Sequence, residues 1–356
     1  MSKFTTLLDR CNSTAAVSAF PSADAFARLL GGFSLTATES RSVFADLVAG
    51  ALSDSLMAAM FVALRMRGET AEELTGAALA LRAAAIEFPA PDTLFADSCG
   101  TGGDSSGSIN VSTAAGLIAA ASGLPLIKHG NGSFTSRCGS ADVLRMLGAK
   151  LDLSPARSRQ VFDEVGFCFL FAPLYHPGIA HAGPVRRALK VRTIMNLLGP
   201  CLNPARPEVQ LVGVPEARFV RPVAETLRAL GTRRALIVHG SGLDELALHG
   251  VTEAIELKDG GLDEYEITPE IAGVPRTPLG LVRGGAPEEN ARRLMQLLDG
   301  KGQAADESIV ALNAGALLYL AGMAADLREG AACAADTIRS GAGQRLLRQF
   351  VEATHG

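Results

Sequence analysis

The chain has 356 residues, of which 48% are hydrophobic and 20% charged, and its 33 Lys and Arg against 37 Asp and Glu give a net charge of −4. This composition supplies a sizeable apolar core and excludes a disordered chain. The slightly negative charge argues against a protein that coats nucleic acid or an anionic membrane, and the length predicts about two domains.

The first ninety residues are predicted to form an all-helical unit. Residues 1–33 carry a weak helical pattern with a break at Pro21 and Ser22. Farther on, two Thr-x-x-Glu sequences have the spacing of a capping box, in which a hydroxyl and a carboxylate satisfy backbone N–H groups at the start of a helix. They begin at Thr36 and Thr70. Apolar residues at helical spacing then predict helices over 37–49, 55–67 and 70–86.

After residue 91 the pattern alternates between short apolar runs and helices, which predicts a mostly parallel sheet. The expected strands are 94–99, 124–128, 167–171, 209–214 and 235–239, followed by two short strands within 252–268. The expected helices are 112–122, 140–147, 155–165, 184–198, 218–230, 287–298, 308–320 and 336–354. The predicted fold class is α/β, with a small all-helical domain at 1–90 and a larger α/β domain at 91–356.

The cysteines and the N-terminus indicate where the protein works. The six cysteines are widely spaced and form no CxxC pair, which is typical of reduced thiols rather than of a disulfide framework. The N-terminus lacks the apolar stretch of a signal peptide, and the longest apolar run is too short to cross a bilayer. We therefore expect a soluble cytoplasmic protein with no membrane partner.

A glycine-rich loop follows the first predicted strand. It contains Gly100, Gly102, Gly103 and Asp104, and a polar run from Asn110 to Thr113 then opens a helix. Glycines let backbone N–H groups approach a phosphate, and a helix N-terminus favours anions. The loop fits neither the GxGxxG nor the GK[ST] phosphate-binding pattern, so a plain strand–helix turn is the alternative.

A second polar run, Lys128-His129-Gly130-Asn131, ends the next predicted strand and continues through Ser136 to Ser140. The carboxyl ends of parallel strands face the ligand crevice of α/β sheets. Basic and hydroxyl groups there suit a multiply charged anion, whereas an ordinary polar loop is the competing interpretation.

Three further charged residues are candidates for chemistry. Asp244 and Glu245 follow the strand at 235–239, where adjacent carboxylates can bind Mg²⁺ together with substrate phosphates. A solvated acidic pair is the alternative. Arg186 lies in the predicted helix 184–198 and can bind a carboxylate through two hydrogen bonds, unless it is simply exposed on the helix.

Together these runs resemble the anthranilate phosphoribosyltransferase family. The matching runs are GTGGD at 100–104, NVST at 110–113, KHGN at 128–131, GSADVL at 139–144, FLFAP at 169–173, PVRR at 184–187, RTIMNLLGP at 192–200 and GLDEL at 242–246. They occur in the order and spacing of the family, and the resemblance covers the chain from about residue 33 onward.

The resemblance implies a fold, a reaction and an assembly. The family transfers the phosphoribosyl group of 5-phosphoribosyl diphosphate (PRPP) to the amine of anthranilate, releases pyrophosphate and serves tryptophan biosynthesis. Its fold is nucleoside phosphorylase/phosphoribosyltransferase-like, with the active site in the cleft between the two domains. The segment at about 184–200 is expected to return to the helical domain, and a homodimer joined through the helical domains is expected.

The resemblance also assigns roles to individual residues. The PRPP site would comprise Gly100, Gly103, Asp104, Ser108, Asn110, Val111, Ser112, Thr113, Lys128, His129, Gly130, Asn131 and Ser136. Anthranilate would contact Gly100, Asn131, His176 and Arg186, with Arg186 on its carboxylate. The Mg²⁺ ligands would be Ser112, Asp244 and Glu245. His129 is the candidate catalytic residue, which would either assist proton removal or simply pack.

This chain departs from the family pattern near the expected substrate cleft. Gly132 stands where the family usually has Arg, the run 133–138 differs, and Gly178 and Ile179 replace an Ala and a Met. These changes keep two alternatives open. One is the same PRPP chemistry on another aromatic acceptor, and the other is a non-catalytic relative that binds nucleic acid.

Overall fold

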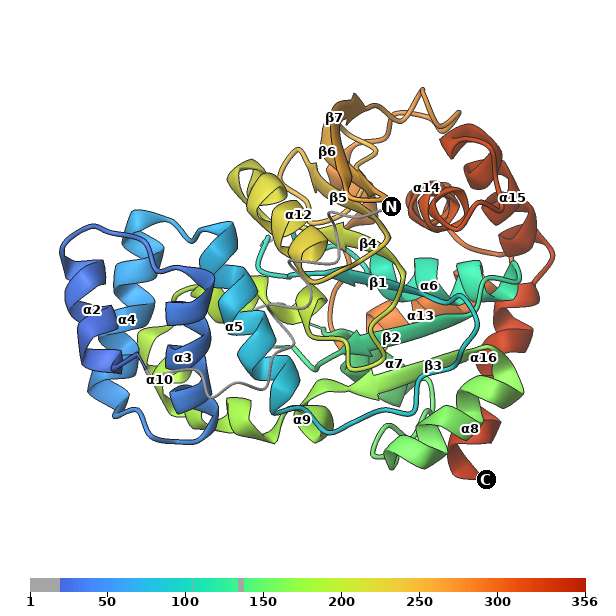
Figure 1. Cartoon of the computed structure of the whole chain (residues 1–356). Coiled ribbons are helices and arrows are strands. Elements are labelled where there is room, and N and C mark those ends of the chain that lie inside the picture. The colour runs from blue at the N-terminus through green and yellow to red at the C-terminus, as the bar shows by residue number, and fades with distance from the viewer. Residues whose placement is uncertain (1–19, 105, 134–137) are drawn as a thin grey trace, which may run out of the picture.

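The computed structural model of the chain describes residues 20–104, 106–133 and 138–356. Figure 1 shows a group of helices beside a central sheet, with further helices on the far side of that sheet. The group of helices comes first in the chain. It contains α2 (Ser22–Leu30), α3 (Ala37–Val48), α4 (Asp54–Arg67) and α5 (Ala71–Ala83).

Both predicted capping boxes are confirmed. The Thr36 and Thr70 hydroxyls accept hydrogen bonds from the backbone N–H groups of Glu39 and Glu73, whose carboxylates accept from Thr36 and Thr70 in return. The predicted break at Pro21 is the start of helix α2, because proline suits the beginning of a helix, where its missing N–H is not needed. The predicted helix 70–86 stops at Ala83.

The central sheet has seven strands in the order β3-β2-β1-β4-β5-β6-β7. Their bounds are β1 (Ala96–Gly100), β2 (Leu126–Gly130), β3 (Phe167–Phe171), β4 (Val209–Gly213), β5 (Arg234–Gly240), β6 (Thr252–Lys258) and β7 (Gly261–Ile267). The pairs among β1 to β5 are parallel, and β6 and β7 extend the sheet as an antiparallel hairpin. The prediction of a mostly parallel sheet is therefore confirmed.

Helices and short helical turns connect the strands and continue after the last of them. The helices are α6 (Val111–Ala121), α7 (Ser140–Met146), α8 (Pro155–Val165), α9 (Ala172–Tyr175), α12 (Val220–Ala229), α13 (Pro287–Leu298), α14 (Ala304–Leu320), α15 (Leu327–Arg339) and α16 (Ala342–His355). The 3₁₀ turns are η1 (Pro177–Ala182), η2 (Gly199–Cys201), η3 (Ala217–Phe219) and η4 (Leu279–Val282). The single helix predicted over 336–354 is wrong, because Gly341 adopts a left-handed conformation (φ +67°) and separates α15 from α16.

The segment predicted as one helix over 184–198 is also broken. Lys190 ends α10 (Gly183–Leu189) in a left-handed conformation (φ 52°), and α11 (Ile194–Leu197) follows after a short turn. Both helices contact α4, and η1 contacts α3. We therefore propose that the helical domain comprises residues 1–90 together with the returning segment at about 184–200, and that 91–356 otherwise form the α/β domain.

Two apolar clusters lie on opposite faces of the sheet, as the alternation of side chains along a strand requires. Leu211 and Leu236 join the cluster beneath α6 and α14. Val212 and Ile237 join a second cluster, which continues through α12 into the helices α3, α4 and α5. The helical domain therefore shares its core with one face of the sheet.

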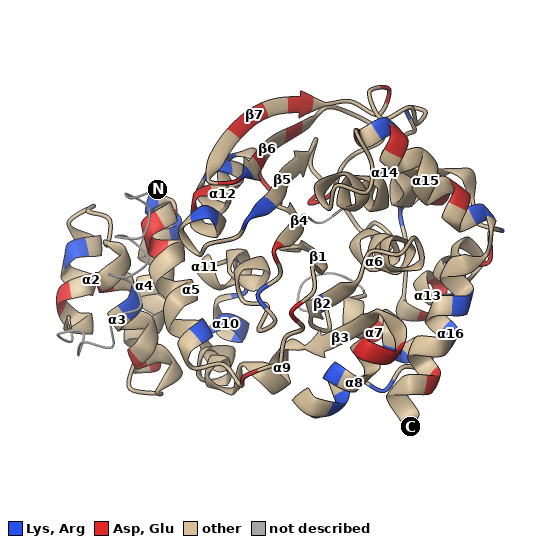
Figure 2. Ribbon diagram, turned by 45° about the vertical axis from the view of Figure 1, so that its right-hand side comes forward, with Lys and Arg blue, Asp and Glu red and all other residues tan. Residues whose placement is uncertain are grey.

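The charged residues are spread over the molecule. Figure 2 shows Lys and Arg interspersed with Asp and Glu along the helices, while β7 carries acidic residues at the sheet edge. Within the described parts of the chain, no helix combines the length and apolar character that a membrane span requires.

Candidate active site

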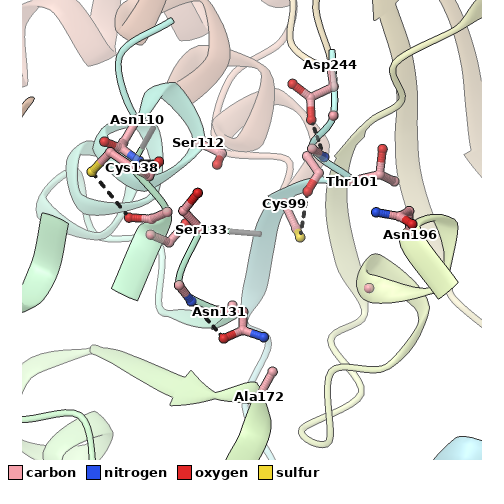
Figure 3. A pocket seen from close by; sticks show the side chains of 18 of the residues that line it. Cys99, Thr101, Asn110, Ser112, Asn131, Ser133, Cys138, Ala172, Asn196 and Asp244 are labelled. Carbon is pink, nitrogen blue, oxygen red and sulfur yellow. Dashed lines mark hydrogen bonds between the residues drawn. The ribbon is translucent and has the colours of Figure 1, made fainter. Parts of the chain in front are cut away.

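A cavity of about 590 Å³ opens at the carboxyl ends of the parallel strands, between the sheet and the returning segment. In Figure 3, Asn110, Ser112 and Cys138 lie on one side of it, Asn196 lies on the other, and Asp244 lies beside Thr101. The cavity brings together most of the residues that the sequence predicted for the site. They are Gly100, Gly103, Asp104, Ser108, Asn110, Val111, Ser112, Lys128, His129, Gly130, Asn131, His176, Arg186, Asp244 and Glu245.

Two predicted PRPP residues do not appear in the cavity wall. Thr113 is fully buried inside α6, because each helical residue is turned by about 100° from the one before it. That turn carries Thr113 from the cavity side of the helix into the core. Ser136 lies outside the described residues.

The glycine loop after β1 is held by the acidic turn. Gly102 and Gly103 have φ values of +72° and +82°, which favour glycine. The N–H of Gly102 donates to Asp244 Oδ2 at 2.6 Å, and the N–H of Thr101 donates to the carbonyl of Gly213 at 2.9 Å. The loop therefore lies directly against Asp244 rather than forming a plain strand–helix turn.

Three glycines form the floor on which Asp244 and Glu245 rest. A Cβ atom at Gly100 would overlap the Asp244 carboxylate, and one at Gly213 would overlap the Asp244 carbonyl. A Cβ at Gly240 would overlap the Glu245 carbonyl. Gly213 and Gly240 were not among the predicted site residues, although the sequence carries a signal for them: strands β1, β4 and β5 all end in glycine.

The acidic pair is buried and strongly perturbed. Burial, followed by repulsion from Asp104, raises the pKa of Asp244 to about 8. Burial and then Asp244 raise the pKa of Glu245, and the Lys128 ammonium opposes that rise. Glu245 Oε1 also accepts from the N–H of Ser112 at 3.1 Å, at the N-terminus of α6. Buried carboxylates that repel one another suit a divalent cation.

Asp244 and Glu245 can bind Mg²⁺ only together with further oxygen ligands. The described residues contain no group of three or more His, Cys, Asp and Glu side chains arranged as metal ligands. The Asp104 Oδ2 atom is buried and has no hydrogen-bond partner, so a carboxylate oxygen remains available beside the pair. Mg²⁺ is commonly bound by one or two carboxylates plus substrate phosphates, which this arrangement matches.

Lys128 is oriented toward the protein. Its ammonium donates to the Ser98 carbonyl and to the Ser112 hydroxyl at 3.3 Å, and its side chain is almost fully buried. Burial raises the pKa of both Asp97 and Glu245, and the positive charge of Lys128 opposes that rise. Lys128 therefore stabilises the floor of the site in addition to lining the cavity.

Two histidines stack edge to face in the wall of the cavity. The rings of His129 and His176 lie 5.2 Å apart, and His176 Nε2 is 3.0 Å from the Leu202 carbonyl oxygen. Burial and the neighbouring His176 lower the pKa of His129 to about 3, and burial lowers the pKa of His176 to about 4. Such a weak base favours packing over proton removal as the role of His129.

The histidine pair predicts a loss of stability in acid. Folding lowers both pKa values from 6.5, so the unfolded chain binds more protons as the pH falls from about 6.5 to about 4. The unfolding free energy should fall by about 1.4 kcal/mol per pH unit for each imidazole in that range. Urea unfolding of the wild type and of His176→Gln at several pH values measures how much of the loss in unfolding free energy comes from His176. Parallel losses in the two proteins would contradict the prediction.

Arg186 lies on α10, where the returning segment forms the cavity wall opposite the sheet. Burial lowers the pKa of its guanidinium. It shares the cavity with Gly100, Asn131 and His176, the other residues predicted to contact the acceptor. Of the described departures from the family pattern, Gly132, Ser133, Cys138 and Ile179 line the cavity. Gly178 instead packs against α3, where a Cβ would lie 2.8 Å from Val48 Cβ.

Comparisons with known proteins agree with this geometry. A family model described as the glycosyl transferase family, helical bundle domain, matches residues 23–85, and the a/b domain model of the same family matches residues 92–344. The anthranilate phosphoribosyltransferase of Sorangium cellulosum is 51% identical over 323 residues, which are 91% of this chain and 93% of the relative.

Solved structures give the same result. The crystal structure of anthranilate phosphoribosyltransferase from Thermus thermophilus superposes with a TM-score of 0.89 at 41% identity, covering 94% of this chain and all of that one (100%). The Saccharomyces cerevisiae enzyme in complex with PRPP and Mg has a TM-score of 0.86 at 25% identity, covering 95% and 99%. The chain belongs to the anthranilate phosphoribosyltransferase family.

Proposed function

We propose that this chain transfers the phosphoribosyl group of PRPP to the amine of anthranilate, giving N-(5-phosphoribosyl)anthranilate and pyrophosphate in tryptophan biosynthesis. The observation that carries the proposal is one cavity with two chemically different ends. Asp244 and Glu245 lie against the glycine loop at one end, and Arg186 lies in the opposite wall. The first end suits a diphosphate with a cation, and the second suits a carboxylate.

The reaction needs positioning and charge stabilisation more than acid–base chemistry. The amine nitrogen bonds to C1 of the ribose while the bond from C1 to the pyrophosphate oxygen breaks, and that electron pair leaves with pyrophosphate. The glycine loop and the positive end of the α6 helix lie where negative charge builds up. The new arylammonium nitrogen is acidic enough to lose its proton to water, so the weak base His129 need not remove it.

We propose Mg²⁺ as the cofactor, held by Ser112, Asp244 and Glu245. When bound, it neutralises the oxygens of the leaving diphosphate. The Lys128 ammonium orients the Ser112 hydroxyl, and the three glycines at the strand ends fix the backbone of the acidic pair. At the acceptor end, the Arg186 guanidinium would bind the carboxylate through two hydrogen bonds and direct the amine toward the ribose.

Two parts of the biological setting are also proposals. Leu30, Phe33 and Met66 are large apolar side chains exposed on the helical domain, at 68%, 63% and 83%, which supports a homodimer formed through that domain. The cysteines of the described residues form no disulfide with one another, which supports a reducing cytoplasm as the location of the protein.

The two alternatives remain distinguishable. The first alternative is transfer to another aromatic amine, because Ile179 and Gly132, which depart from the family pattern, lie in the cavity wall. Nucleic-acid binding is less well supported, because the chain carries a net charge of −4 and keeps its buried acidic pair.

The test of the proposed function is the decay of anthranilate fluorescence in the presence of purified protein, PRPP and Mg²⁺, with EDTA as the control. We expect a decay that requires all three components and stops with EDTA. Binding of PRPP without decay would favour another acceptor. No binding of PRPP would favour the non-catalytic relative.

A further inference from the structure

A segment near the C-terminal helices closes one side of the glycine loop. The N–H of Ile109 donates to the carbonyl of Val282 at 3.0 Å, and the N–H of Gly284 donates to the carbonyl of Gly107 at 2.7 Å. Between these bonds, Ser108 forms an antiparallel bridge with Arg283. Residues 282–285 therefore act as a short strand against the stretch that carries Ser108, one of the predicted PRPP residues.

The position of this short strand is fixed from α13. Arg293 is 5% exposed and forms an ion pair with the buried Asp306 of α14. Its guanidinium also donates to the carbonyls of Arg283 and, at 3.1 Å, Leu281. The backbone of the short strand is thus held by a buried guanidinium whose three nitrogens all donate hydrogen bonds, which is a rigid support.

Asn290, also on α13, extends this support into the cavity. Its side chain is 3% exposed and lines the cavity. Asn290 Oδ1 accepts from the N–H of Gly285 at 2.8 Å, and its Nδ2 donates to Asn110 Oδ1 at 3.0 Å. Asn110 Nδ2 in turn donates to the Cys138 carbonyl at 3.1 Å.

This chain of amides determines which way Asn110 points. The Asn110 side-chain amide can take either of two orientations, which exchange its oxygen and its nitrogen. Because Asn290 Nδ2 donates a hydrogen bond, it selects the orientation in which Asn110 Oδ1 faces Asn290 and Asn110 Nδ2 faces the Cys138 carbonyl. Asn110 precedes α6 and makes no side-chain capping bond to it, so these two contacts orient it instead. The chain links three walls of the cavity: α13, the start of α6 and the polar segment after β2.

We propose that Asn290 is a positioning residue for PRPP, acting through Asn110 rather than by touching the reacting atoms. The inference rests on the proposed function. Without Asn290, the Asn110 amide loses the partner that selects its orientation, and the Cys138 carbonyl loses a fixed donor. PRPP binding must then order these groups, which weakens its affinity. The carboxylate of anthranilate is expected at Arg186 on α10, which this chain of amides does not touch, so anthranilate binding should be little affected.

The test is a double-mutant cycle with Asn290→Ala, Asn110→Ala and the combined variant. Steady-state kinetics give both KM values and kcat, and calorimetry gives the Kd of PRPP with Mg²⁺ independently of turnover. Asn290→Ala should raise the Kd and KM of PRPP about tenfold, with kcat and the anthranilate KM within about twofold. In the Asn110→Ala background the same change should add less than about twofold, because Asn110 is no longer there to be positioned.

A matched control separates positioning from loss of stability. Leu294 lies on the same helix and is buried, so Leu294→Val weakens the packing of α13 without touching Asn110 and should leave the PRPP Kd unchanged. Asn290→Ser replaces the alanine variant if that variant does not fold. An unchanged PRPP Kd, or an equal effect in both backgrounds, would overturn the inference. If wild-type protein binds PRPP but does not consume anthranilate, the proposed function fails while the cycle still tests Asn290.

Discussion

Replacing both Asp244 and Glu245 by alanine should lower Mg²⁺-dependent turnover by about a thousandfold or more. The two carboxylates are buried beside the glycine loop, and burial and neighbouring carboxylates raise the pKa of both, an arrangement that favours a shared cation. Without them, the diphosphate leaves the ribose with its negative charge uncompensated. The measurement is kcat from the anthranilate fluorescence decay, across a range of Mg²⁺ concentrations.

The chain contains its own control for this experiment. Asp263 and Glu264 are another adjacent acidic pair, but they are exposed on β7 at the sheet edge. Alanine at both positions should leave turnover within about twofold, as is usual for surface changes away from a site. Retention of wild-type turnover by the Asp244 and Glu245 variant would remove this pair from the metal site.

Replacing Arg186 by alanine should raise the KM for anthranilate about 10- to 100-fold, while the KM for PRPP stays within about twofold. The split is expected because Arg186 is on the returning segment, across the cavity from the glycine loop and the acidic pair. Steady-state kinetics with each substrate varied in turn would measure it. Arg186→Lys should have an anthranilate KM between those of the wild type and Arg186→Ala, because lysine keeps the positive charge but cannot form the two parallel hydrogen bonds of a guanidinium with a carboxylate.

A substrate analogue provides the control for Arg186. Aniline carries the amine but no carboxylate, so its turnover should be similarly low in the wild type and in Arg186→Ala. Equal increases in both KM values would place Arg186 outside the acceptor end of the cavity. A large loss with aniline would point to a general disturbance of α10.

Local signals in the sequence were sufficient for much of the fold. The capping boxes at Thr36 and Thr70 depend on residues only three apart, so their positions could be predicted. Strand β3 is a continuous apolar run, and its bounds were predicted for that reason. The break at Gly341 was missed because the helical pattern continues on both sides of it, and only the left-handed conformation of that residue shows that the helix ends.

The candidate site was predictable where one motif carries several of its residues. The cavity indeed gathers the glycine loop, the run after β2 and the acidic pair. Contacts between distant segments had no such signal: Asn290 and Asn110 are 180 positions apart, and Asn is common in ordinary loops. The buried position of Thr113 was missed because all four residues of the run 110–113 were assigned to the PRPP site together. In a helix, consecutive side chains point in different directions, and that of Thr113 points into the core.

The contact of α10 and α11 with the N-terminal helices affects how this protein is made. Ribosomes release the N-terminal helices first, yet α10 and α11, which contact α4, come from residues after 182. Until more than half of the chain has been synthesised, the apolar faces of Phe61 and Leu64 lack part of the cluster that buries them. The nascent chain must therefore carry an incomplete bundle until α10 and α11 have been made, and a product terminated before residue 183 would lack both helices and expose that surface permanently.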